Sequence, residues 1–473
     1  MTRTNNNTRL RARRSSSDCV PARRISYCTL ISILSTVALV ASAEDSWPTY
    51  MHDNARSGVS DTALEVEQLG EPLWVYRSPA PPRTAWSGPP PMDAGHKKAR
   101  LPATRDFDTA LFVTAKSGRA YFGSSVTDSV HCVDAATGET RWRFRTGGPV
   151  RFPPSLSNGR VYFGSDDGLV YCADESTGRE IWRYAAGEPD ARLIGNDGNL
   201  VTFWPVRTSV AVDDGKVYFA ASLVPWVDPY LCSLDAQTGS DDGERLYRVR
   251  AVAPRVMDDY AGSPLSPMGA ILVSPTRLIL MQGRIAPQIF DRETGQHIDA
   301  FRPPQDGWLT SMSIWTGGGT YALLTPENHV VTGRGRIWTS GSTLNEFRED
   351  QPRDVVARHP SAYAMVIDGA HAFVIVSRHT IDEDGEWVET RSTVACLDRE
   401  SDTVIWQTET GVLYSLIKVG ELLIVGGDEM ALALAASDGK ELWRQEVDGR
   451  ATGLAAAEGR LFVSTDVGHI YAY

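Results

Sequence analysis

The sequence predicts an all-β protein, an eight-bladed β-propeller built from four-stranded antiparallel blades, and three observations lead to this fold. A motif with Asp and Gly four residues apart occurs in CVDAATGETRW (132–142) and again, 40 residues later, in CADESTGREIW (172–182). Alternating apolar runs split by Asp-Gly or Asn-Gly pairs recur beside these motifs, as is typical of short strands joined by tight hairpins. The chain after residue 43 shows no long, capped helical period.

The repeated motif is interpreted as the turn between the third and fourth strands of a blade. Thr-Gly permits such a turn, and the Asp side chain can cap backbone amides in it. Four-stranded units repeated every 40–50 residues are typical of propellers. Further copies are SLDAQTG (233–239), IFDRETG (289–295), CLDRESD (396–402) and ALAASDG (433–439). We expect tryptophans on outer strands to dock against the next blade, and the residues assigned to this contact are Trp74, Trp142, Trp182, Trp406, Trp443, Gly138, Gly178 and Gly439.

The two ends of the repeat array predict how the ring closes. GHIYAY (468–473) aligns with GLVYCA (168–173), so the last repeat lacks its fourth strand, whereas EPLWVYRS (71–78) is a strand without a partner hairpin. We expect this N-terminal strand to pair with the C-terminal blade, which would remove exposed sheet edges. Counting outer strands gives eight blades, but the sixth lacks the turn motif, so seven blades plus a long insertion is the alternative.

The N-terminal segment has the features of a signal peptide. Residues 1–24 carry seven Arg, an apolar run of 16 residues follows at 25–40, and ASA stands at 41–43. We therefore expect cleavage after Ala43 and export to the periplasm or the extracellular space, with no membrane span remaining. An uncleaved anchor is the alternative. The expected organisation is a signal peptide (1–43), an N-terminal arm (44–70) and a propeller (71–473) with a Pro-rich insertion (78–106).

Charge and cysteine spacing exclude some classes of function. Removing residues 1–43 changes the net charge from −12 to −18, and an acidic surface repels phosphate backbones, so we expect no nucleic-acid partner. Cys132 and Cys172 are 40 residues apart, at one position of consecutive repeats. Stacked sheets lie about 10 Å apart, too far for a disulfide, so we expect buried thiols. The chain is expected to be a monomer.

With these copies in view, the chain resembles the quinoprotein-like propeller superfamily, whose PQQ-like repeat carries Ala-x-Asp-x-x-Thr-Gly-x-x-x-Trp. The resemblance covers residues 71–473 and implies the fold more strongly than a function, because the superfamily contains both dehydrogenases and non-catalytic scaffolds. Membership among its alcohol dehydrogenases would imply pyrroloquinoline quinone (PQQ) above Ca²⁺ and an adjacent Cys-Cys pair. This chain has no Cys-Cys dipeptide and no C-x-x-C-H haem motif. We therefore expect no cofactor and no catalytic residues or metal ligands, with PQQ and calcium as the alternative.

Two arginines are the strongest candidates for a binding site. PVRFPPSLSNGRVYF (149–163) and WPVRTSVAVDDGKVYF (204–219) align without gaps, which places Arg151 and Arg207 at one position of adjacent blades, where the innermost strand begins. Two guanidiniums there could hold a carboxylate, a phosphate or an acidic side chain. The alternative is that they pair with the protein's own Asp and Glu. Further candidates are Asn196, Asp197 and Trp204, although NDGN also has the composition of a turn.

The sequence favours an exported, non-catalytic propeller that binds or scaffolds other proteins of the cell envelope, or holds an anionic small ligand. The nearest functional analogy within the superfamily is to propellers of the Bam-complex lipoprotein B type, which support outer-membrane protein assembly. Unlike them, this chain has no Cys after its signal region to take a lipid. A PQQ-dependent dehydrogenase and an extracellular carbohydrate or small-anion binding protein are the alternatives.

Overall fold

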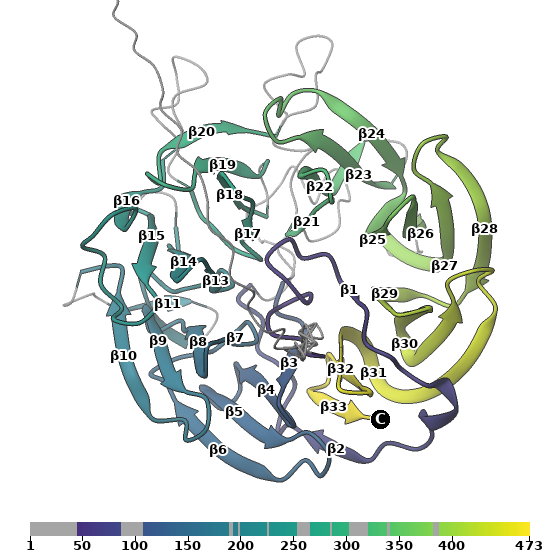
Figure 1. The fold of residues 1–473 in the computed structure, drawn as a ribbon, viewed down its shortest axis with the longest axis horizontal. Coiled ribbons are helices and arrows are strands. Elements are labelled where there is room, and N and C mark those ends of the chain that lie inside the picture. The colour runs from purple at the N-terminus through teal and green to yellow at the C-terminus, as the bar shows by residue number, and fades with distance from the viewer. Residues whose placement is uncertain are drawn as a thin grey trace, which may run out of the picture. The chain divides into compact units, whose positions relative to one another are not determined.

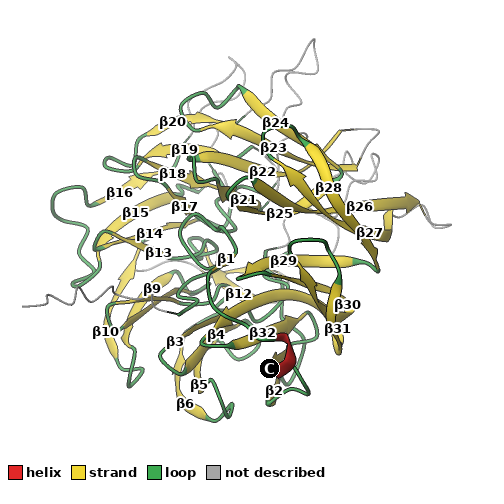
Figure 2. Ribbon diagram, turned by 45° about the vertical axis from the view of Figure 1, so that its right-hand side comes forward, coloured by secondary structure: helices red, strands yellow, loops and turns green. Residues whose placement is uncertain are grey.

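The structure is a computed structural model, which describes residues 45–86, 107–188, 193–196, 199–224, 227–252, 265–283, 286–301, 320–337, 341–381 and 387–473. The predicted signal peptide and residues 87–106 of the Pro-rich insertion lie outside these ranges. Asp45–Tyr473 form one compact unit, in which antiparallel sheets follow one another around a central axis (Figure 1). The one helical element in the described part is the 3-10 turn η1 (Val66–Gln68), and Figure 2 shows strands throughout the rest. The all-β propeller fold is thereby confirmed.

Six sheets contain four consecutive strands each, with the first strand innermost (Figure 1). The first three sheets consist of β3 (Val113–Lys116), β4 (Arg119–Ser124), β5 (Ser129–Asp134) and β6 (Thr140–Arg145); β7 (Ser155–Ser157), β8 (Arg160–Gly164), β9 (Leu169–Asp174) and β10 (Glu180–Ala185); and β13 (Ala211–Asp213), β14 (Lys216–Ala221), β15 (Tyr230–Asp235) and β16 (Tyr247–Arg250). The next three consist of β17 (Leu272–Val273), β18 (Arg277–Leu280), β19 (Gln288–Asp291) and β20 (His297–Ala300); β21 (Tyr321–Leu324), β22 (His329–Ile337), β23 (Gly341–Arg348) and β24 (Val355–Pro360); and β25 (Ala362–Asp368), β26 (His371–Ile381), β27 (Trp387–Asp398) and β28 (Thr403–Thr410).

Apart from the two-stranded hairpin of β11 (Leu193–Asn196) and β12 (Asn199–Thr202), the remaining strands form a seven-stranded sheet in the order β1-β29-β30-β31-β32-β33-β2. Its members are β1 (Val59–Ser60), β2 (Trp74–Arg77), β29 (Leu413–Val419), β30 (Leu422–Ala435), β31 (Glu441–Ala457), β32 (Arg460–Thr465) and β33 (His469–Ala472). β31 pairs with β30 as far as Arg450 and with β32 from Ala451 onward, so one long strand is outermost in one blade and innermost in the next. Dividing the sheet there would give two blades, as the prediction of eight requires; the number itself stays a prediction.

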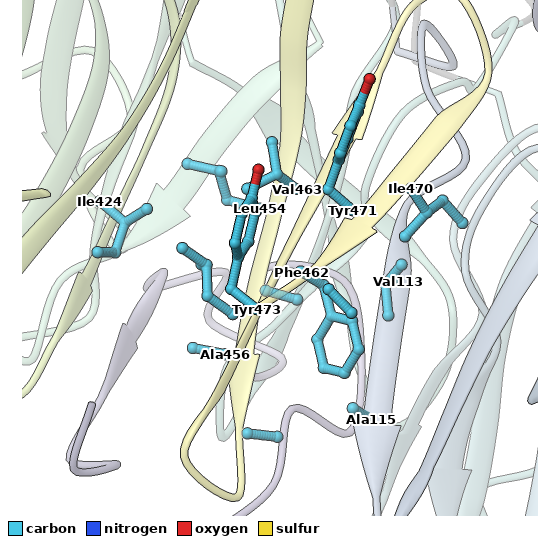
Figure 3. Close-up of a cluster of buried hydrophobic side chains, with 14 of the residues drawn as sticks. Val113, Ala115, Ile424, Leu454, Ala456, Phe462, Val463, Ile470, Tyr471 and Tyr473 are labelled. Carbon is cyan, nitrogen blue, oxygen red and sulfur yellow. The ribbon is translucent and has the colours of Figure 1, made fainter. Parts of the chain in front are cut away.

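The ring closes as the two chain ends predicted. β2 pairs antiparallel with β33, with Trp74 opposite Ala472 and Arg77 opposite His469. Val113 and Ala115 on β3 belong to the same buried cluster as Phe462 and other side chains of the last blade (Figure 3). Closure therefore removes two sheet edges and buries apolar surface between the first and last blades.

Where an aromatic residue docks on its glycine, the repeated turn joins a blade to the one before it. In the turn after β9, Asp174 Oδ1 accepts a hydrogen bond from the amide of Thr177 at 2.8 Å. The Trp142 Nε1–H donates to the carbonyl of Glu175 at 3.0 Å, and a Cβ on Gly178 would lie 2.6 Å from the Trp142 ring. Equivalent contacts are made by Trp74 with Ala135 and Gly138, Trp182 with Ala236 and Gly239, Tyr247 with Arg292 and Gly295, and Trp406 with Ala436 and Gly439. Trp443 instead packs edge-on against the Tyr473 ring at 5.1 Å.

The repeated Cys lies directly across the sheet from the docking tryptophan. Cys132 is opposite Trp142 and Cys172 is opposite Trp182, and both are buried free thiols. Burial raises the pKa of Cys132 to about 12 and that of Cys172 to about 11. These thiols therefore act as small apolar side chains that leave room for the indole.

The N-terminal arm crosses the inner strands of the ring (Figure 1). Trp47 forms an isolated bridge with Ala115 and is 1% exposed. Arg56 is equally buried, and its guanidinium donates to the carbonyls of Tyr50, Asp53 and Ile271 and to the hydroxyls of Thr49 and Ser209. The arm is thus part of the folded core. No helix in the described ranges is both long and apolar enough to span a membrane.

Candidate functional site

The structure brings the two equivalent arginines together on one carboxylate. Arg151 directly precedes the β7 region and Arg207 precedes β13, while Asp166 lies in the turn between β8 and β9. Arg151 Nε and Nη2 donate to Asp166 Oδ2 at 2.9 and 2.7 Å. Arg207 Nη2 donates to the same oxygen at 3.0 Å, and its Nε donates to Oδ1 at 3.3 Å. Adjacent blades therefore share one anion at their inner ends.

A second carboxylate comes from the segment that follows the Pro-rich insertion. Arg151 Nη1 donates to Asp108 Oδ2 at 2.5 Å and to the carbonyl of Arg83 at 2.7 Å. The amide of Ala85 donates to the same Asp108 oxygen at 2.7 Å. The guanidinium of Arg207 lies over the Trp86 ring, 5.2 Å from its centroid. The described ends of the insertion therefore meet at the arginine pair.

The four charged groups are almost completely removed from water, because none of their side chains is more than 3% exposed. Burial alone would raise the pKa of Asp166, but the charges of Arg207 and Arg151 hold it below its usual value. Burial dominates at Asp108 and raises the pKa of that carboxyl, although Arg151 opposes the shift. The pKa of Arg151 is raised by the two carboxylates despite its burial.

The network is not fully satisfied. Among the residues that the structure describes, Arg207 Nη1 and Asp108 Oδ1 are both buried and have no hydrogen-bond partner. Buried polar atoms in proteins are rarely left in this state. We refer to Arg151, Arg207, Asp166 and Asp108 together as the central cluster.

Of the other predicted site residues, one joins the central cluster and one does not. Asn196 ends β11 (Leu193–Asn196), which pairs with β12 (Asn199–Thr202) as a separate hairpin, and its Oδ1 accepts from Arg207 Nη2 at 2.7 Å. The indole of Trp204 lies against Gly187, and its Nε1 donates to the carbonyl of Asp228 at 2.7 Å. Trp204 therefore packs in the rim between two blades. Asp197 lies outside the described residues.

Sequence reasoning did not identify Asp166, Asp108 or Trp86 as members of the site. Asp166 directly precedes the pair Asp167-Gly168, which is of the kind that predicts a tight hairpin, and it does lie in the β8–β9 turn. The signal that could have found it is the position of this turn, at the end of the blade where Arg151 begins the inner strand. Asp108 and Trp86 flank an irregular segment with no equivalent in other repeats, so no alignment within the chain points to them.

The residues of the centre do not fit a calcium-bound quinone. Within the described ranges, no group of three or more His, Cys, Asp and Glu side chains is placed to hold a metal ion, whereas Ca²⁺ takes six to eight oxygen ligands. Both oxygens of Asp166 accept from guanidiniums. Beside the cluster, Phe107 stacks on Phe152 at 5.5 Å, and Tyr50 meets the Phe152 ring edge-on. The space next to the charges is therefore filled by the chain itself.

A cavity of about 480 Å³ opens elsewhere, between the β13–β14 hairpin and the turn after β19. Its lining includes Arg292, which pairs with Asp213, donates to Tyr218 Oη at 3.1 Å and donates to the carbonyl of Ser274 at 3.0 Å. All three nitrogens of this guanidinium are engaged within the wall. The other charged residues of the lining are paired as well, Lys216 with Asp214 at 3.7 Å and Arg245 with Glu293 at 3.3 Å. The charged groups of this cavity therefore bind one another, and they leave few donors or acceptors for a ligand.

Comparison with known proteins identifies a matching family and solved structures with a similar fold. A family model described as outer membrane protein assembly factor BamB matches residues 67–296 and 390–473. Among solved structures, the quinohemoprotein alcohol dehydrogenase from Comamonas testosteroni has a TM-score of 0.60 at 12% identity, covering 90% of this chain and 80% of that one. A europium-containing methanol dehydrogenase has a TM-score of 0.57 at 11% identity, covering 89% of each chain. These identities support a shared fold alone. No curated protein matches the sequence.

Proposed function

Because the chain belongs to the family described as outer membrane protein assembly factor BamB, we propose that it is an exported, non-catalytic binding and scaffold module of the cell envelope. The observation that carries this proposal is the state of the ring's centre. There the candidate polar groups bind one another, with Arg151 and Arg207 both on Asp166. Because these groups already bind one another, the centre mainly makes the ring rigid. We therefore expect the outer surface to contact other proteins.

The hairpin β11–β12 is the surface element that best suits a protein partner. Leu193 and Leu200 are 59% and 70% exposed on it, and large exposed apolar side chains held on a fixed base are typical of protein contacts. The base is fixed because Asn196 bonds to Arg207 and because Val201 and Thr202 are buried. We propose that envelope proteins are the partners, in keeping with the name of the family.

The experiment is affinity purification of the full-length chain from its host envelope after crosslinking. Wild type is compared with the double variant Leu193→Ser, Leu200→Ser. Val404→Ser on β28, where Val404 is 54% exposed, serves as a matched control at a distant surface. We expect the hairpin variant to lose a specific envelope partner that wild type and the control retain. Equal recovery by all three proteins would contradict the role of the hairpin.

The dehydrogenase alternative is tested on the same preparation. Purified protein is incubated with PQQ and Ca²⁺, and dye-linked alcohol oxidation and the quinone absorbance spectrum are recorded. We expect neither turnover nor a stable quinone complex, because the described centre lacks the ligands. Turnover above that of a heat-denatured sample would overturn the non-catalytic proposal.

A further inference from the structure

We propose that Arg151 and Arg207 form a carboxylate-binding site, which Asp108 occupies from within the same chain and in which an external carboxylate can take its place. This inference does not depend on the proposed function, since it concerns only the chemistry of the central cluster. Its test requires no protein partner.

The first argument is the charge of the ring itself. Among the described residues of the blades, Asp166 is the one carboxylate that forms ion pairs with the two guanidiniums, Arg151 and Arg207. The balance is completed by Asp108, which comes from outside the blades and is 43 residues from Arg151 in sequence. Without Asp108, the ring would hold one buried positive charge that lacks a counter-ion, which is strongly unfavourable. The ring is therefore built to receive one more anion.

The second argument is that Asp108 fits this place incompletely. It accepts from Arg151 through Oδ2 alone, while its Oδ1 has no partner among the described residues. In the described part of the chain, Arg207 Nη1 also has no partner, and its side chain is 1% exposed. A carboxylate is well matched to the forked donors of arginine. One that faced both guanidiniums could accept from Arg207 Nη1 as well, so Asp108 is a replaceable ligand.

The surroundings favour a small, flat group. The Trp86 ring lies against the guanidinium of Arg207 and limits the space on that side. Phe107 precedes Asp108 and is itself 6% exposed among apolar neighbours. A carboxylate meets these limits better than a tetrahedral phosphate does. Both a free carboxylic acid and the side chain of an acidic peptide have the required chemistry.

The test removes the internal carboxylate and adds one from outside. Asp108→Ala leaves Arg151 with one partner fewer, so the melting temperature of the variant should be lower than that of wild type. Sodium formate should then raise that temperature with a saturating dose dependence, because a ligand that binds only the folded state stabilises it. Sodium chloride at equal ionic strength should not. Wild type should bind formate at least about tenfold more weakly than the variant, since Asp108 must first leave.

The matched control is the double variant Asp108→Ala, Arg207→Met, in which the unpartnered donor is gone. Its formate-dependent shift should be lost or strongly reduced. An equal shift in the single and double variants would overturn the proposal, and so would the absence of any formate-specific shift in a folded Asp108→Ala protein. Acetate and a doubly blocked peptide with one Asp, compared with its Asn counterpart, distinguish a small acid from an acidic side chain.

A second variant keeps the proposal testable if Asp108→Ala does not fold. Asp108→Asn preserves the side-chain volume and the bonds from Arg151 and Ala85, but removes the charge. The neutral amide is a weaker ligand for two guanidiniums than the carboxylate is, so formate should displace it more easily and should stabilise this variant more than it stabilises wild type. If formate has no more effect than chloride, or the same effect when Arg207→Met is added, the proposal is wrong.

Discussion

Two kinds of junction hold neighbouring blades together, and they differ in chemistry although they occupy the same place. At the junction of β6 with the turn after β9, the Trp142 ring covers Gly178 and its Nε1–H bonds to the carbonyl of Glu175. At the junction of β20 with the turn after β23, the corresponding position is Asp299, which pairs with Arg353 at 3.5 Å. We call these the tryptophan junction and the ion-pair junction.

The next junction in the chain is also ionic. Ala357 on β24 stands opposite Glu346, where other blades have Trp opposite Cys. Arg399 of the following turn bonds to Glu327 at 2.8 and 3.0 Å and approaches Glu346 at 3.7 Å. A buried indole removes 150–250 Å² from water, whereas a solvent-exposed ion pair such as Asp299–Arg353 contributes about 0–1 kcal/mol. The two kinds of junction therefore occupy the same position between blades, but we expect the tryptophan junction to stabilise the fold much more than the Asp299–Arg353 ion pair does.

The largest expected effect is the loss of a tryptophan junction. Trp142→Ala should lower the free energy of unfolding by about 3–5 kcal/mol, because it removes a large buried side chain and leaves a cavity. Urea unfolding followed by fluorescence or circular dichroism measures this change. The loss should not depend on salt. A loss below about 1 kcal/mol would mean that the indole contributes little more than the ion pairs do.

Acidification should weaken the junction at which the ring closes. His131 on β5 stacks on Phe122 at 4.7 Å and meets Tyr76 of β2 at 5.8 Å. Burial, helped by the charge of Arg143, lowers its pKa to about 4. Between pH 6.5 and 4 the unfolded chain therefore binds a proton that the folded chain does not, so stability falls as the pH falls. The expected loss is on the order of 3 kcal/mol, fully developed below pH 4.

The control for this prediction is His131→Phe, which keeps the ring stack and removes the titrating group. Urea unfolding of both proteins between pH 4 and pH 7.5 gives the contribution of His131 as the difference between the two curves. Parallel curves would show that other groups cause the acid sensitivity.

A smaller gain is expected from restoring the motif glycine at the second ionic junction. Asp402 holds the Gly position of its turn with φ of 54°, a region that costs a non-glycine residue roughly 1–2 kcal/mol. Asp402→Gly should therefore stabilise the protein by at most about 1 kcal/mol, because glycine also adds entropy to the unfolded chain. Thermal unfolding of the variant beside Asp402→Asn, which removes the charge but keeps the Cβ, separates relief of strain from loss of charge.

How far the sequence could predict this molecule depends on which features repeat. Trp74 and Tyr473 stand at opposite ends of the chain, yet the missing fourth strand of the last repeat predicted that they share a blade. Arg151 and Arg207 were found because a gapless alignment assigned them to one position in adjacent blades. Asp108 could not be found in this way, because it belongs to a segment that occurs once. An alignment of repeats therefore identifies residues that recur in several blades, such as Arg151 and Arg207, but it cannot identify a partner such as Asp108 from a segment that occurs once.

The smallest expected effect is at the first ionic junction. Asp299 and Arg353 are 30% and 70% exposed, so water and salt screen their attraction. Asp299→Asn removes the charge and keeps the acceptor for the Ala300 amide, which Asp299 Oδ1 now binds at 2.8 Å. The cost should be about 0.5 kcal/mol or less at low salt and should vanish in 1 M NaCl, where the Debye length is about 3 Å. If the variant still loses stability in high salt, the ion-pair junction at Asp299 is stabilised by packing, as the tryptophan junctions are.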